Sequence, residues 1–150
     1  TYPQRMESST TLQVLVGIFL LLEALNVLTL YFAPGSNLGN GIGVFDGWAA
    51  SQEDEDLGPF VRYLVSWVAG TKLIFIGLWL VILLTADGTT QFWASVVMVP
   101  AIATFYWRLY PTIRQLDEAG QITPKGYSKV LAWMIAGMIL AFVVAIVVAI

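Results

Sequence analysis

A lysine, Lys72, lies near the middle of a long apolar run, residues 61–85. As a helix, a run of this length crosses the hydrocarbon core of a bilayer, which takes roughly 20 apolar residues. A charged side chain at that depth is costly unless it is paired or hydrated. The preceding apolar run, 12–33, carries Glu23 near its own middle, with Asn26 one helical turn further along the same face. We therefore expect Glu23 and Lys72 to meet at one depth in adjacent spans.

Four apolar runs of membrane-spanning length occupy most of the 150 residues. With 58% hydrophobic and only 11% charged residues, the chain lies outside the usual range of soluble domains. We predict an all-α integral membrane protein, a single membrane domain of four transmembrane helices in an antiparallel bundle. The expected spans are 12–33, 61–85, 91–110 and 130–150, with a long loop at 34–60 and a short helical extension at 111–120.

The loop at 34–60 is rich in glycine in its first part and acidic in its second. Trp48 predicts contact with the lipid headgroup layer, which favours an interfacial loop. A pore-lining, re-entrant loop is the alternative, and it requires protein or water to cover the backbone. The acidic run at 53–56 lacks the alternating ligand spacing of a calcium loop, so a solvated turn is favoured over a cation site.

Small residues at helical spacing predict faces where helices approach closely. In the second span these are Gly70 and Gly77, on a different face from Lys72. We therefore expect the second span to touch neighbours on two sides and to form the centre of the bundle. The last span has small residues at four-residue intervals, namely Gly137, Ala141, Ala145 and Ala149.

Aromatic and basic residues mark the expected membrane surfaces. Arg62 opens the second span, and Trp107 with Arg108 closes the third, which Pro100 is expected to kink. Five lysines and arginines lie in the loops after spans one and three, against Arg5 on the opposite side. Because basic residues gather on the cytoplasmic side, both termini are predicted to be non-cytoplasmic.

The chain has neither histidine nor cysteine. This removes disulfides, thiolate nucleophiles, the usual zinc sites, axial haem histidines and the commonest general base. No catalytic motif is present, so we expect no enzyme activity and no cofactor, and we expect bound lipids. A net charge of −3 with clustered acids indicates no nucleic-acid partner.

Two functions remain open for the Glu23 and Lys72 pair. The first is a non-catalytic accessory or scaffold subunit of a larger membrane complex, in which the pair is structural and the bundle around it is closed. The alternative is a small homo-oligomeric proton or cation carrier or channel, in which water reaches Glu23 from one face at a time. A charge that pairs with another subunit or with a lipid headgroup is a third interpretation.

Overall fold

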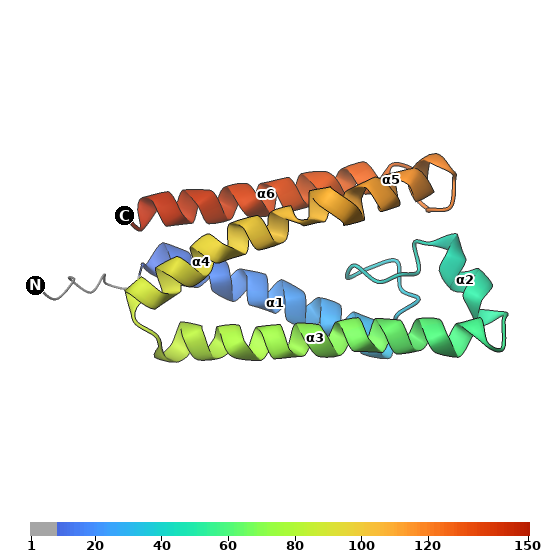
Figure 1. Ribbon diagram of the computed structural model, residues 1–150, viewed down its shortest axis with the longest axis horizontal. Helices are drawn as coiled ribbons and strands as arrows, with labels where there is room; N and C mark the ends of the chain where they lie inside the picture. Colours follow the sequence, from blue (N-terminus) through green and yellow to red (C-terminus); the bar gives the residue numbers. More distant parts are fainter. Residues whose placement is uncertain (1–8) are drawn as a thin grey trace, which may run out of the picture.

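A computed structural model describes residues 9–150, which form an all-α four-helix membrane bundle, as predicted (Figure 1). Four helical stretches are long and apolar enough to cross a membrane, and the third of them runs from Gly88 through to Glu118. The elements are α1 (Thr10–Phe32), α2 (Asp46–Gln52), α3 (Leu57–Thr85), α4 (Gly88–Ala103), the π-helix η1 (Phe105–Leu109), α5 (Tyr110–Glu118) and α6 (Tyr127–Val148).

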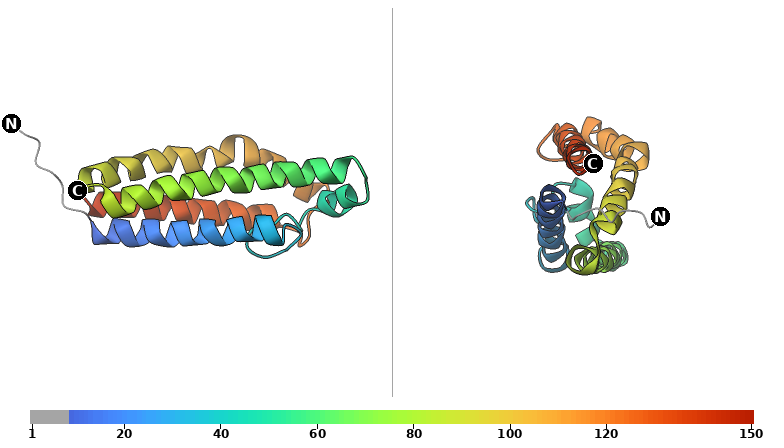
Figure 2. Two further views of the ribbon diagram at one scale, coloured as in Figure 1. Left: turned by 90° about the horizontal axis from the view of Figure 1, so that it is seen from below. Right: turned by 90° about the vertical axis from the view of Figure 1, so that its left-hand side faces the viewer.

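The four long helices form a ring in the order α1, α3, α4, α6, seen end-on in Figure 2. The main contacts are between α1 and α3, between α4 and α6, and between α1 and α6. The pairs α1–α3 and α4–α6 diverge toward the end of the bundle opposite the C-terminus, where α2 and α5 lie (Figure 1). We call this the loop end, and the other the terminal end.

The most buried of the four spanning helices is α1, and the expectation that the second span would form the centre of the bundle is wrong. In the most apolar stretch of α1, 33% of the residues are buried, against 17% for α3. The physical reason is that α1 packs on both α3 and α6, whereas α3 and α4 separate soon after the short turn that joins them.

Three features of the chain alter the expected helix bounds. The helix α3 begins at Leu57 because the Asp54 carboxylate accepts the Leu57 N–H at 2.8 Å and so caps its first turn. The loop at 34–60 contains the short helix α2. After Pro100, the third span changes to a π-helix at η1, since proline cannot donate a hydrogen bond in the ladder and the helix must readjust.

Aromatic rings fill the middle of the bundle. The Phe19 ring lies edge-on to that of Phe142, with centroids 5.6 Å apart, and edge-on to that of Phe75 at 6.0 Å. Phe142 is completely buried, and Ala145, one turn nearer the terminal end, is also buried. Edge-to-face pairs contribute about 0.5–1.5 kcal/mol each beyond area burial, so this cluster holds α1, α3 and α6 together.

A second, smaller cluster closes the loop end. It consists of Val44, Ile113 and Ile122, which are all buried. Thr123 donates its backbone N–H to the Val44 carbonyl at 2.9 Å, so the glycine-rich loop is hydrogen-bonded to the link between α5 and α6. The loop is therefore packed in place.

Candidate functional site

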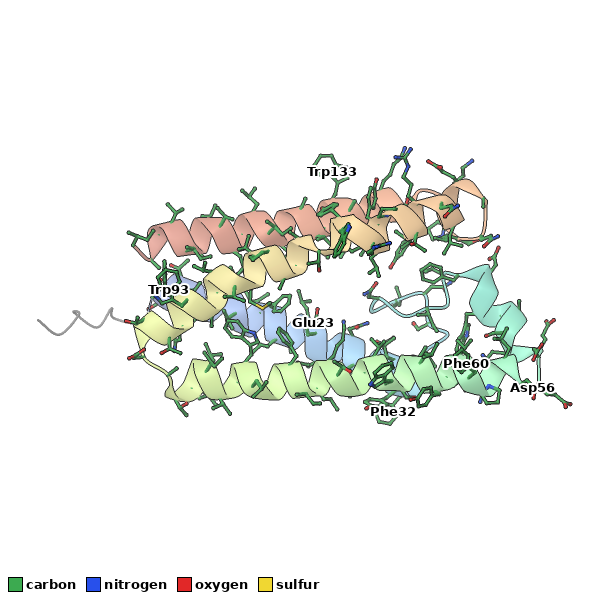
Figure 3. All side chains as sticks on the ribbon, in the orientation of Figure 1. Glu23, Phe32, Asp56, Phe60, Trp93 and Trp133 are labelled. Carbon is green, nitrogen blue, oxygen red and sulfur yellow. The ribbon has the colours of Figure 1, made fainter. Side chains whose placement is uncertain are left out.

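The side chains of Glu23 and Lys72 meet between α1 and α3. The Lys72 Nζ lies 2.7 Å from Glu23 Oε2 and donates a second hydrogen bond, of 2.6 Å, to Asn26 Oδ1. Glu23 and Asn26 reach one ammonium group because residues three apart lie on the same face of a helix. Figure 3 places Glu23 near the middle of the long axis of the molecule. The side chains of the ion pair are about a quarter exposed, at 27% for Lys72 and 24% for Glu23.

Asn26 also binds the glycine-rich loop. Its Nδ2 donates to the carbonyls of Gly39 at 2.7 Å and Asn40 at 3.0 Å. Gly39 and Asn40 both have positive φ, at 64° and 56°, and this left-handed backbone belongs to the turn that brings both carbonyls to one amide. A Cβ on Gly39 would lie 2.4 Å from Thr29 Oγ1, so glycine is also required by the space available.

The loop folds back along α1 into the bundle. Asn26 lies six residues before Phe32, the last residue of α1, which corresponds to about 9 Å along the helix axis. Loop residues that contact Asn26 therefore lie well inside the helix end. Gly39 and Asn40 are themselves exposed, so Asn26 holds them from the bundle side.

A cavity of about 830 Å³ opens beside the ion pair, between α1, the α4–η1 segment and α6. This volume is within the usual range for small-molecule sites, about 300–1,000 Å³. Most of its wall is apolar, and its charged residues are Glu23, Lys72 and Arg108. The lining also includes Phe19, Leu22, Leu25, Asn26, Gly39, Asn40, Ala101, Ile102, Thr104, Phe105, Trp107, Leu109, Leu131, Met134, Ile135 and Met138.

The cavity is closed on one side only. On α1, the α4–η1 segment and α6, its lining residues come from the middle of the helices and from the half nearer the loop end. Toward the terminal end the lining stops at Phe19, whose ring packs on that of Phe142. It is not sealed from the surroundings, because Trp107 and Met134 line it with exposed fractions of 72% and 64%. The ion pair thus lies at the wall of an open, one-ended cavity.

The predicted packing residues occupy different surroundings. A Cβ on Gly70 would lie 3.3 Å from the Tyr31 hydroxyl of α1, so this glycine permits a close approach between the two helices. A Cβ on Gly77 or Gly137 would meet no atom within 4 Å, and both positions are exposed. Ala145 is buried inside the bundle, whereas Ala141 and Ala149 are half-buried.

The predicted anchors and the acidic run all lie toward the loop end. Trp48 covers Gly35, and Arg62 donates to Gln52 Oε1 at 2.7 Å. The Arg108 guanidinium lies 5.1 Å from the centre of the Trp107 ring, a cation–π contact. Within residues 9–150, no three acidic side chains come together as a metal site, and of the acidic run Asp54 serves as a helix cap.

Two buried polar residues were missed by the sequence analysis. Asp117 accepts the backbone N–H groups of Gly126 at 2.8 Å and Ser128 at 2.9 Å, and so caps the start of α6. Gln91 donates to the carbonyls of Leu83 and Ala86 and so caps the end of α3. Neither contact follows a short local motif, since the partner groups are brought together by the turns between the helices.

Comparison of the sequence with known protein families and curated proteins, and of the fold with solved structures, finds no match. The function is therefore argued from the geometry of the cavity.

Proposed function

We propose that this chain is a non-catalytic membrane protein that binds an amphiphilic molecule in the cavity between its two helix pairs. The observation that carries the proposal is the cavity itself, a mostly apolar chamber of about 830 Å³ whose wall carries the bonded group of Glu23, Lys72 and Asn26 and, separately, Arg108. Apolar walls with a few placed polar groups are typical of ligand sites. An amphiphile matches both parts of this lining.

A purely structural role of the ion pair fits less well. A structural pair is expected in a closed bundle, whereas a quarter of each side chain is exposed here. Empty volume next to charged groups also forfeits packing contacts that a closed bundle would have. The site is better suited to taking up a molecule than to sealing two helices together.

Transport of a proton or cation fits the geometry less well than binding does. A carrier needs access to Glu23 from each face in turn, but the aromatic contact of Phe19 with Phe142 blocks the path toward the terminal end. Lys72 also neutralises the carboxylate at 2.7 Å. Proton or cation flux in vesicles that is lost in Glu23→Gln, at unchanged thermal stability, would favour the carrier over the binding protein.

The binding proposal is tested by native mass spectrometry of the full chain in micelles containing dioleoyl phospholipids. We expect the wild-type chain to retain bound phospholipid after release from the micelle. The variant Met138→Trp places a large ring in the cavity and should reduce this retention strongly, because Met138 is part of its wall.

The matched control is Leu140→Trp. Leu140 belongs to the same helix but is 63% exposed and does not line the cavity, so this variant should retain phospholipid as the wild type does. Equal retention by both variants, or no retention by the wild type, contradicts the proposal.

An accessory role in a larger membrane assembly is the second candidate, and the outer face of α6 favours it. Gly137 is exposed there with open space beside it, and the Trp133 side chain points away from the bundle (Figure 3). Small residues let another helix approach closely. Native gel migration tests this role: the wild type should migrate in a larger assembly that Gly137→Leu disrupts, while Val147→Leu, at another exposed position of α6, should leave it intact.

A further inference from the structure

The cavity carries a net positive charge. Glu23 and Lys72 neutralise each other at 2.7 Å, which leaves Arg108 as the third charged residue of the lining. No acidic side chain among residues 9–150 lies within ion-pair distance of Arg108. Its guanidinium rests on the exposed Trp107 ring, at the edge of the cavity.

The site also has hydrogen-bond donors that the described part of the protein leaves unused. The Lys72 ammonium has three N–H groups, of which one bonds Glu23 and one bonds Asn26. The Arg108 guanidinium has five N–H groups, and none of them has an acceptor within residues 9–150. A ligand that complements this wall is rich in acceptors and negatively charged.

The rest of the wall fits a hydrocarbon chain. Phe19, Leu22, Met134 and Met138 line the cavity, and the flexible methionine side chains adapt to an irregular chain. Exposed Leu22 and Met134 leave a lateral opening on helices that are apolar enough to lie in the bilayer. A lipid can therefore reach the cavity without leaving the membrane.

We propose that the cavity binds a bilayer lipid whose phosphate headgroup has a net negative charge, with the phosphate at Arg108 and the free N–H of Lys72 and an acyl chain along the Phe19–Met138 wall. This proposal rests on the proposed function and adds the chemical class of the ligand. Phosphate is suited to arginine because its oxygens accept two parallel N–H bonds from the guanidinium plane. Basic pockets between membrane helices recognise acidic headgroups in this manner.

The experiment compares two lipids with identical dioleoyl chains, phosphatidylglycerol and phosphatidylcholine, titrated onto the full chain in micelles and followed by native mass spectrometry. One unpaired basic residue near an anionic headgroup contributes about 1 kcal/mol, so we expect about fivefold tighter binding of phosphatidylglycerol. The preference should decrease as salt is raised, because the headgroup charge is screened.

The variant Arg108→Gln should bind both lipids about equally, and Arg108→Lys should keep most of the preference. The matched control is Arg114→Gln, which removes an exposed arginine that already pairs with Glu118 at 2.7 Å and lies outside the cavity. This control should keep the fivefold preference. Glycerol phosphate at the same concentration should not displace the lipid, which separates a lipid site from a site for a free phosphate compound.

The outcomes distinguish the two proposals. If the wild type binds both lipids equally, the anionic headgroup proposal is wrong and the amphiphile-binding function stands. If the wild type binds neither lipid, both proposals are wrong. If Arg108→Gln keeps the preference while remaining folded, as judged by circular dichroism, Arg108 is not the headgroup residue. The salt and headgroup comparison on the wild type decides the proposal even if that variant does not fold.

Discussion

The Lys72 ammonium and the Asn26 amide are joined by a hydrogen bond of 2.6 Å, and the same amide group holds the glycine-rich loop through the carbonyls of Gly39 and Asn40. One buried asparagine therefore connects three parts of the chain that are distant in sequence: α1, α3 and the loop. Its Nδ2 donates two hydrogen bonds and its Oδ1 accepts one. The position of the loop and that of the ion pair are consequently coupled.

Replacement of Asn26 by leucine should release the loop. The variant keeps a similar side-chain size but removes the two hydrogen bonds to Gly39 and Asn40, so amide hydrogen exchange across residues 39–43 should rise strongly. Leu28→Ala, on the exposed face of α1, is the control and should leave this exchange unchanged. Unchanged exchange in the Asn26 variant would show that the loop is held by other contacts.

The Glu23 and Lys72 pair should show energetic coupling. Because both side chains are about a quarter exposed, we expect Glu23→Gln or Lys72→Met to reduce the free energy of unfolding by about 1–3 kcal/mol. The double variant should lose less than the sum of the two. Denaturant unfolding in micelles measures this cycle, and Thr71→Val, next to Lys72 but bonded only to Trp67 of its own helix, is the control. Simple additivity would exclude a direct interaction.

Gly43 should tolerate no side chain. A Cβ there would lie 2.0 Å from the Gly35 carbonyl oxygen, which is backbone and cannot move freely. We expect Gly43→Ala to cost about 1–3 kcal/mol in the free energy of unfolding, as overpacking does. Gly47→Ala is the matched control, because a Cβ at Gly47 meets nothing within 4 Å and alanine favours the helix α2. An equal loss of stability from the two substitutions would contradict the close approach of Gly43 to the backbone of Gly35.

Asp117 should be essential for the start of α6. It is buried and accepts three hydrogen bonds, from the N–H of Gly126, the N–H of Ser128 and the Ser128 hydroxyl. Asp117→Ala should lower the midpoint of thermal unfolding by several degrees, because buried donors lose their acceptor. Glu118→Ala removes the adjacent, exposed acid of a surface pair and should have little effect. A similar shift of the thermal midpoint in both variants would contradict the capping role of Asp117.

Acid should release the cap of α3. Hydrogen bonds to the Asp54 carboxylate, first from the Leu57 N–H and to a smaller extent from the Asp56 N–H, hold the pKa of Asp54 below its ordinary value of 3.8. Because the folded pKa is the lower one, the contribution of the cap is complete well above pH 3.8 and is lost as the pH falls through the folded pKa. The Leu57 amide resonance should therefore shift with a midpoint below pH 3.8. This transition should be absent in Asp54→Asn and present in Asp56→Asn; its persistence in the first variant would contradict the cap.

Several local features were predictable because they depend on neighbouring residues alone. Long apolar runs define helices and spans, since a bilayer offers no hydrogen bonds to an open backbone. The positions of Glu23 and Asn26 on one face follow from the helical repeat. The break in the regular α-helix after Pro100 follows from its missing N–H, although the π-helix that takes its place does not. The sequence by itself thus determined the all-α membrane class and the residues worth testing.

Only the tertiary structure decided how the helices are arranged around those residues. Three contacts join groups that lie far apart in the chain or across a turn. These are the packing of α1 on both α3 and α6, the cap from Asp117 to α6 and the return of the loop to Asn26. The cavity beside Lys72 exists because the helix pairs diverge at the loop end, a property of crossing angles and packing volumes. No local pattern encodes such distances, because they result from how all the side chains fill space together.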